Sequence, residues 1–329
     1  MGNSRSLHAI IIGAGPAGLG VAVCLAKRGV PFTLLERGTA ALAGLLQVDP
    51  EMILLSPTCL SRMPDMEVRN GSPNYLSFRQ MVDELQSYQQ EHKIEVVTEA
   101  EVMGVEQSGN DFVVRYKDAT GGERVVNGSH VINAAGQISA PRLPDEFEPG
   151  RCSFRWQHSI ATRARDLQES RRLLVVGGGP SAAEVLENWL EVRRADDGAW
   201  ISLRSPLVAI PHWILGVDIH YLGWLVEQIP TRILGGRRLR IREPMLGRKI
   251  PRAIQKGLIT AVPAARQFEG NQVTLTDGKK LEPDLVVFAT GFRYTAKHLG
   301  ELVEYGATGQ PMVRACESRR VPRLYLLGL

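Results

Sequence analysis

A glycine-rich hexapeptide at residues 13–18 is the feature that most limits how this sequence can fold. It reads Gly-Ala-Gly-Pro-Ala-Gly and lies between an apolar run at 7–12 and a helix-forming stretch at 16–28. A second apolar run, 32–36, ends in Glu36. Strand, glycine turn, helix and strand within about 30 residues form a βαβ unit, and this order is typical of a dinucleotide site.

Each part of this first motif has a chemical role. Gly13 permits the tight turn, Gly15 lets the backbone approach a pyrophosphate, and Gly18 lets helix and strand pack closely. The start of the helix offers free N–H groups and the positive end of its dipole to phosphates. Glu36 can accept hydrogen bonds from ribose hydroxyls, which suits the unphosphorylated ribose of FAD. We therefore expect an FAD site at Gly13, Ala14, Gly15, Pro16, Ala17, Gly18, Glu36 and Arg37.

The same pattern recurs in the middle of the chain. Residues 177–182 read Gly-Gly-Gly-Pro-Ser-Ala between an apolar run at 172–176 and a helical stretch at 180–194. The next run, 200–204, ends in Arg204, where a guanidinium can bind the 2′-phosphate of NADPH and a carboxylate would repel it. The alternative is an exposed arginine without that role. We expect an NADPH site at Gly177, Gly179, Pro180, Ser181, Ala182, Arg204 and Ser205.

The remaining patterns complete an α/β fold with two Rossmann-like, three-layer ββα domains, the NADPH domain inserted into the FAD domain. The expected FAD domain comprises residues 1–145 and 291–329, and the NADPH domain comprises 146–290. Further elements are a helix at 79–92, an antiparallel meander at 102–106, 112–116 and 124–126, and strands at 94–98, 131–135, 272–276, 285–289 and 322–327.

With these motifs, the chain resembles the flavoproteins that have two dinucleotide-binding domains. Residues 133–136 (Asn-Ala-Ala-Gly) and 288–292 (Phe-Ala-Thr-Gly-Phe) are similar to the two segments that link the domains in that superfamily. In those proteins both segments pass near the cofactors. The resemblance implies a structural role for Asp284, and cofactor contacts by Val102, Ala135, Gly136, Thr290 and Gly291.

Within the superfamily, the chain looks most like the flavin-containing and YUCCA-type (class B) monooxygenases. The matching stretches are Gln-His-Ser at 157–159, residues 172–184, and an insert after Arg204 that ends at 247–251. The resemblance implies that NADPH reduces FAD and that a C4a-(hydro)peroxyflavin transfers one oxygen of O₂ to a small organic substrate. In relatives, a loop and helix covering the flavin follow the strand that resembles 322–327, so the exposure of the flavin stays open here.

Two other functions remain open. One is an NADPH-dependent flavin reductase or dehydrogenase, similar to low-molecular-weight disulfide reductases that lack a CxxC pair. The other is a non-catalytic flavoprotein that senses nucleotides. No two of the four cysteines lie within four residues of each other, which excludes a CxxC redox pair and a zinc ribbon.

Composition narrows the remaining classes. The formal net charge is only +4, and no basic run is interleaved with aromatic residues, so we expect no nucleic-acid partner. The uncharged stretch at 9–26 contains several glycines and a proline, which argues against a membrane span. We also expect no cleaved signal peptide, because cleavage would remove the first glycine motif. We expect a cytoplasmic enzyme whose partners are a small-molecule substrate and O₂, and a homo-oligomer remains open.

Three further features have ordinary and functional interpretations. The aromatic and aliphatic stripe at 210–233 is a packed surface or lid, a substrate tunnel, or a membrane-interface segment. The arginines and lysines at 237–252 form a solvated basic face or attract an anion. His158, His212 and His220 have no metal-ligand spacing with Asp, Glu or Cys, so we assign no metal and take His158 as structural.

Overall fold

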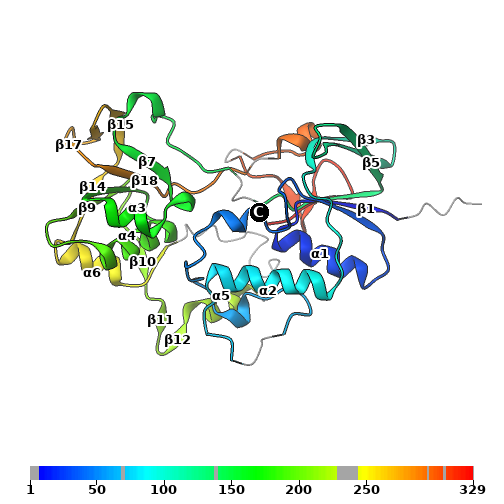
Figure 1. The fold of residues 1–329 in the computed structure, drawn as a ribbon, viewed down its shortest axis with the longest axis horizontal. Helices are drawn as coiled ribbons and strands as arrows, with labels where there is room; N and C mark the ends of the chain where they lie inside the picture. The colour runs from blue at the N-terminus through cyan, green and yellow to red at the C-terminus, as the bar shows by residue number, and fades with distance from the viewer. Residues whose placement is uncertain are drawn as a thin grey trace, which may run out of the picture. The chain divides into compact units, whose positions relative to one another are not determined.

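The chain forms two compact units in a computed structural model, which describes residues 7–67, 71–136, 140–227, 244–294, 296–306 and 309–328. Unit 1 comprises Met1–Ala140 and Phe292–Leu329, and unit 2 comprises Pro141–Gly291 (Figure 1). The first change of unit therefore lies after residue 140, where the sequence predicted 145, and the second after 291, where it predicted 290. One reason is that the Arg142 amide donates a hydrogen bond to the Gly291 carbonyl oxygen, at 2.9 Å, within unit 2.

Unit 1 is built on a six-stranded sheet in the order β19-β20-β21-β6-β1-β2. The four strands β21, β6, β1 and β2 are parallel neighbours, and β19 and β20 extend the sheet antiparallel. The bounds are β1 Ala9–Ile12, β2 Phe32–Leu35, β6 His130–Asn133, β19 Val313–Arg314, β20 Glu317–Ser318 and β21 Leu324–Leu326.

The side chains of β1 point alternately into two layers, as strand geometry requires. Ile11 packs with α1 (Pro16–Ala26) and α2 (Phe78–Glu91). Ile10 and Ile12 pack against the meander of β3 (Glu101–Ser108), β4 (Asp111–Lys117) and β5 (Glu123–Gly128). Unit 1 therefore has helices on one face of its sheet and a second small sheet on the other (Figure 1).

Unit 2 repeats this plan around a fully parallel sheet in the order β14-β9-β8-β18-β7. On β8, Leu173 and Val175 pack with α4 and α6, whereas Leu174 and Val176 pack with β15 and β16. The bounds are β7 Arg155–His158, α3 Ala164–Glu169, β8 Arg172–Val176, α4 Pro180–Val192, β9 Gly198–Leu203, α6 Lys249–Gln255, β14 Ile259–Pro263, β15 Ala265–Glu269, β16 Gln272–Leu275, β17 Lys280–Leu281 and β18 Leu285–Phe288. Two three-layer ββα units, one inserted into the other, confirm the predicted fold class.

One predicted strand is wrong. Residues 94–98 contribute only an isolated parallel bridge between Leu35 and Val97 beside the edge strand β2. Val97 donates a backbone hydrogen bond to the Leu34 carbonyl oxygen and accepts one from the Glu36 amide, each at 2.8 Å, but its neighbours do not continue this pairing into a ladder.

Smaller elements follow β9 in unit 2. They are β10 Ala209–Ile210, β11 Trp213–Ile214, β12 Val217–Asp218, α5 Ile219–Glu227 and β13 Met245–Leu246. Among the described residues, no helix has both the length and the apolar character that crossing a bilayer requires.

Candidate functional site

The first glycine motif opens α1 in unit 1 with an exposed stretch of backbone. Gly13 has a φ of +100°, and a Cβ there would lie 2.5 Å from the Ala134 carbonyl oxygen, so only glycine fits. A Cβ on Gly18 would lie 1.9 Å from the Gly13 carbonyl oxygen. Gly15 is the N-cap of α1, and a Cβ on it would meet no described atom within 4 Å. No side chain therefore covers Gly15, and the N-terminal amides of α1 are accessible there.

Glu36 is held in place directly after β2. Its Oε2 accepts a hydrogen bond from the Ala14 amide and its Oε1 from the Gly38 amide, each at 2.8 Å. These two bonds fix the carboxylate beside the glycine turn, while further lone pairs stay available for a ligand hydroxyl.

Two neighbouring hollows of about 400 and 490 Å³ border this turn. Both are lined by Gly13, Glu36, Arg37 and Ala135, so the predicted residues of unit 1 meet around one region. The first hollow adds Gly15, Pro16, Ala17 and Gly136, and the second adds Val102. Ala14 and Gly18 do not line either hollow; both are buried in the turn and helix behind it.

Sequence reasoning missed Lys297 and His298, which line the second hollow. The His298 Nε2 lies 2.9 Å from the side-chain oxygen of the buried Asn133, whose amide nitrogen donates to the Tyr294 hydroxyl at 2.6 Å. Burial lowers the pKa of His298 to about 4. These residues carry no motif of their own, and they meet Gly13 only because the chain returns to unit 1 after residue 291.

The second glycine motif builds an equivalent opening in unit 2. Gly177 has a φ of +132°, and a Cβ there would lie 2.2 Å from the Ala289 carbonyl oxygen. Gly179 is the N-cap of α4, followed by Pro180, and a Cβ on Gly179 would meet no described atom within 4 Å. In both units the first glycine therefore lies against the end of a neighbouring strand, and the glycine at the helix N-cap stays open.

A hollow of about 410 Å³ lies at this helix start and brings most of the predicted residues of unit 2 together. Arg204, which directly follows β9, lines the hollow. Arg142 also lines the hollow and adds a second guanidinium, which the sequence did not predict. Ala182 and Ser205 do not line the hollow, and Ala182 is fully buried in α4. The predicted residues that do line it are Gly177, Gly179, Pro180, Ser181, Arg204, Thr290 and Gly291.

His158 supports the wall of this hollow. It is buried, and its Nε2 lies 2.9 Å from the Gly291 carbonyl oxygen. Burial lowers the pKa of His158, which favours the neutral ring donating from Nε2 to that carbonyl. The Thr290 hydroxyl also donates to the Arg142 carbonyl oxygen. These contacts are consistent with the expected structural role of His158, which would be to hold the Thr290–Gly291 turn in place.

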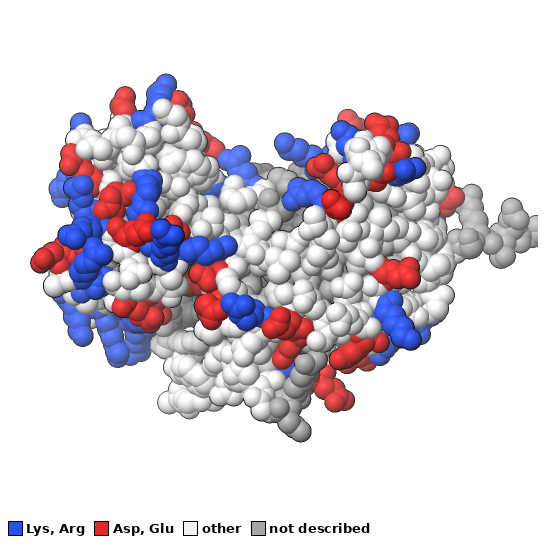
Figure 2. All heavy atoms as spheres, viewed as in Figure 1, with Lys and Arg blue, Asp and Glu red and all other residues white. Residues whose placement is uncertain are grey.

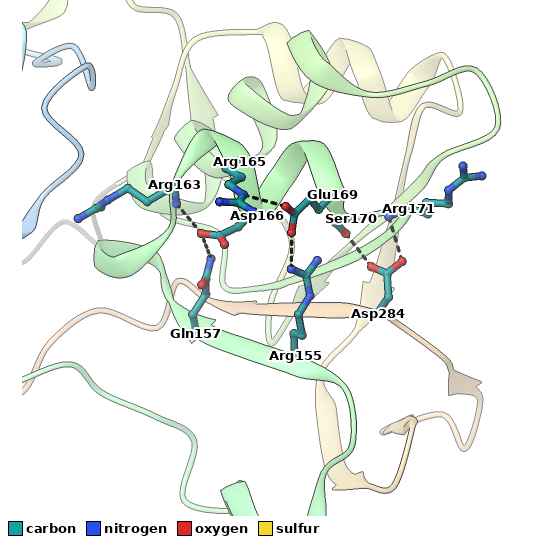
Figure 3. Close-up of polar contacts among 9 residues, drawn as sticks. All are labelled: Arg155, Gln157, Arg163, Arg165, Asp166, Glu169, Ser170, Arg171 and Asp284. Atoms are coloured by element: carbon teal, nitrogen blue, oxygen red, sulfur yellow. Dashed lines mark hydrogen bonds and ion pairs between the residues drawn. The ribbon is translucent and has the colours of Figure 1, made fainter.

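Asp284 holds the far end of the same sheet (Figure 3). Its Oδ1 accepts a hydrogen bond from the Ser170 hydroxyl at 2.7 Å. Its Oδ2 accepts from the amides of Arg171 at 2.9 Å and Arg172 at 3.0 Å. The carboxylate thus joins the starts of β8 and β18, which agrees with the structural role that the resemblance implied.

The described part of the stripe at 210–233 is exposed within unit 2. Trp213 and Trp224 are 52% and 48% exposed, and Leu215 at the tip of the β11–β12 hairpin is fully exposed. Figure 2 shows mainly uncharged atoms in this region. Residues 228–243, which include Arg237, Arg238, Arg240 and Arg242 of the predicted basic cluster, lie outside the described residues.

The sequence predicted no metal because the histidines had no metal-ligand spacing with an acidic residue or a cysteine. For His212 and His220 this interpretation is wrong. His212 Nε2 lies 3.1 Å from Asp218 Oδ2, and His220 Nδ1 lies 2.7 Å from Asp218 Oδ1. The β11–β12 hairpin causes this approach, because it folds His212 back onto Asp218 and His220, six and eight residues further along the chain.

Comparisons with known proteins agree with this architecture. The family model for pyridine nucleotide-disulphide oxidoreductases matches residues 10–194. The chain is 28% identical over 327 residues to indole-3-pyruvate monooxygenase YUCCA4 of Oryza sativa subsp. japonica, covering 87% of this chain and 74% of that protein.

Two solved structures show the same fold. A flavin-containing monooxygenase from Stenotrophomonas maltophilia has a TM-score of 0.74 at 22% identity, covering 98% of this chain and 90% of that one. Bacillithiol disulfide reductase from Bacillus cereus has a TM-score of 0.72 at 16% identity, covering 97% and 89%. The expected resemblance to flavoproteins with two dinucleotide-binding domains is thereby confirmed.

Proposed function

Because the chain belongs to the pyridine nucleotide-disulphide oxidoreductase family, we propose that it is a monooxygenase that uses FAD and NADPH. The family and the relatives make it a flavin-dependent oxidoreductase. The likeness to YUCCA4 supports a monooxygenase, and the assignment of FAD and NADPH rests on one observation. Each unit has an open helix N-terminus beside a hollow, one adjoining the Glu36 carboxylate next to Arg37 and the other adjoining the guanidinium groups of Arg142 and Arg204. This pairing fits one unphosphorylated and one 2′-phosphorylated dinucleotide.

FAD fits the site in unit 1. The open backbone at Gly15 and the start of α1 would hold its pyrophosphate, because the free amides and the helix dipole favour phosphate there. Glu36 would accept hydrogen bonds from ribose hydroxyls while its own amide contacts keep it in place. Gly13, Ala135 and Gly136 would line the same path.

NADPH fits the site in unit 2. The start of α4 at Gly179 would hold the pyrophosphate, and Arg204 would bind the 2′-phosphate. Arg142 lines the same hollow and would add positive charge near the phosphates. His158 would keep the turn at Gly291 in its binding shape.

When bound, reduced nicotinamide supplies hydride to the flavin, and reduced flavin supplies the chemistry that activates O₂. The protein residues named above bind and orient the two cofactors. Because YUCCA4 is named for indole-3-pyruvate, this carbonyl compound is the first substrate to test. Soft nitrogen and sulfur nucleophiles are the second group.

The experiment is to measure NADPH consumption, O₂ consumption and product together with the purified holoenzyme. Our proposal predicts that a true substrate yields oxygenated product in step with NADPH and carries one atom of labelled O₂. If every carbonyl, nitrogen and sulfur substrate leaves only hydrogen peroxide, the monooxygenase assignment fails while the cofactor assignment stands.

A second candidate is an NADPH-dependent flavin reductase or disulfide reductase without a CxxC pair. The specific observation in its favour is the fold shared with bacillithiol disulfide reductase, along nearly the whole of both chains. Anaerobic NADPH oxidation with a low-molecular-weight disulfide as the acceptor would support this candidate over the monooxygenase.

A further inference from the structure

The β11–β12 hairpin gathers two imidazoles and a carboxylate at the start of α5. Trp213 pairs with Asp218 and Ile214 with Val217, and the turn between the strands has positive φ at Leu215 (50°) and Gly216 (81°). The amide of Ile219 donates to the His212 carbonyl oxygen at 2.9 Å. The backbone therefore holds His212 beside the first residues of α5.

Asp218 lies between the two rings. Its two carboxylate oxygens lie 3.1 Å from His212 Nε2 and 2.7 Å from His220 Nδ1. One nitrogen of each ring and one carboxylate oxygen all lie within 4.8 Å of one another. The two rings are edge to face, with centroids 5.6 Å apart and planes at 77°. One cation could therefore reach all three donor atoms after small rotations of these side chains.

The carboxylate of Asp218 is unusual because it is fully buried, whereas both histidines are 26% exposed. Its Oδ1 also accepts a hydrogen bond from the His220 amide at 2.8 Å, which caps the start of α5. A buried carboxylate needs hydrogen bonds, positive charge or a metal to compensate for its lost hydration, and the His220 amide and both imidazoles lie against this one. The exposed edges of the histidines leave a route from solvent to this group.

We propose that His212, Asp218 and His220 form a binding site for a divalent transition-metal ion, for which Zn²⁺ is the probe. Two imidazole nitrogens and one carboxylate oxygen suit Zn²⁺, Co²⁺ and Ni²⁺. Three protein ligands leave a fourth position for water or another ligand. The proposal is independent of the cofactor and monooxygenase assignments.

The test measures metal binding by the FAD-loaded full chain after its exposed thiols, Cys59 and Cys316, have been alkylated. Equilibrium dialysis against Zn²⁺ should give one tight equivalent per chain, and Co²⁺ should give visible ligand-field bands of a nitrogen and oxygen site. His220→Ala and His212→Ala should each weaken Zn²⁺ binding about tenfold or more.

Asp218→Asn provides a variant that keeps the fold, because asparagine caps helices as well as aspartate does. It should lose Zn²⁺ affinity like the histidine variants while its thermal unfolding without metal changes little. His92→Gln, in unit 1, is the matched histidine control and should bind Zn²⁺ like the unmodified sequence.

Two results would overturn the proposal. One is that the unmodified protein binds no more Zn²⁺ in equilibrium dialysis than His220→Ala does. The other is that Asp218→Asn and both histidine variants retain full Zn²⁺ affinity, which would make the cluster a hydrogen-bonded brace of the hairpin.

Discussion

Glu36 and Arg204 occupy corresponding positions, each directly after the strand that follows a glycine-opened helix, and they carry opposite charges. A carboxylate is suited to ribose hydroxyls, whereas a guanidinium is suited to a phosphate. Both side chains line hollows that include the first glycine of their own motif. We propose that, at the scale of single residues, these two charges decide which nucleotide each unit prefers.

Replacing Arg204 tests this directly. Arg204→Ala should raise the KM for NADPH roughly 10- to 100-fold, the range expected when a charged hydrogen bond is lost. The KM for NADH should change little, because NADH has no 2′-phosphate. Arg165→Ala, on the exposed surface of α3, is the control and should leave both values unchanged. An equal loss for NADH and NADPH would refute the phosphate assignment.

His298 gives a prediction about pH. Its pKa falls from 6.5 to about 4 because burial disfavours the charged ring, so the folded state favours neutral His298. The resulting stabilisation is complete above the ordinary pKa and is lost as the pH falls towards about 4. When the pH drops from about 7 to about 4, the free energy of unfolding of His298→Gln should therefore fall by about 1 to 3 kcal/mol less than that of the unmodified protein. Urea unfolding at both pH values measures this, and identical losses in the two proteins would contradict it.

At the scale of elements, α1 and α4 have the same construction at their N-termini. Each begins after a glycine cap with proline at the first helical position, and neither cap carries a side chain. These helix starts could be predicted from the sequence because glycine at a turn and proline at a helix start have strong local conformational preferences.

Other elements could not be predicted in this way. The segment 94–98 has the composition of a strand but finds only one bridging partner, which depends on tertiary contacts. The approach of His212 to Asp218 depends on positive φ at Leu215, and leucine gives no signal of such a turn. Arg142 and His298 line the hollows through contacts between residues far apart in sequence.

Matched substitutions at the two open helix caps separate the two sites. Gly15 and Gly179 both have negative φ and open space, so valine should fit the fold at either position and block only the ligand. Gly15→Val should abolish FAD retention during purification. Gly179→Val should keep FAD and instead weaken NADPH binding, measured by the rate of flavin reduction at varied NADPH concentration. A yellow, fully loaded Gly15→Val protein would refute the pyrophosphate placement.

At the scale of the whole molecule, the chain contains two complete ββα units, each with its own buried core. Unit 2 is inserted between two segments of unit 1, so the residues that line one hollow come from both ends of the sequence. We infer that one polypeptide holds both nucleotides.

The absorbance spectrum of the purified protein, recorded before and after anaerobic addition of NADPH, tests that claim most directly. The account predicts the two visible bands of a bound flavin, about one FAD per chain on extraction, and bleaching by NADPH at concentrations where NADH acts slowly. A colourless protein that takes up neither added FAD nor NADPH would contradict it.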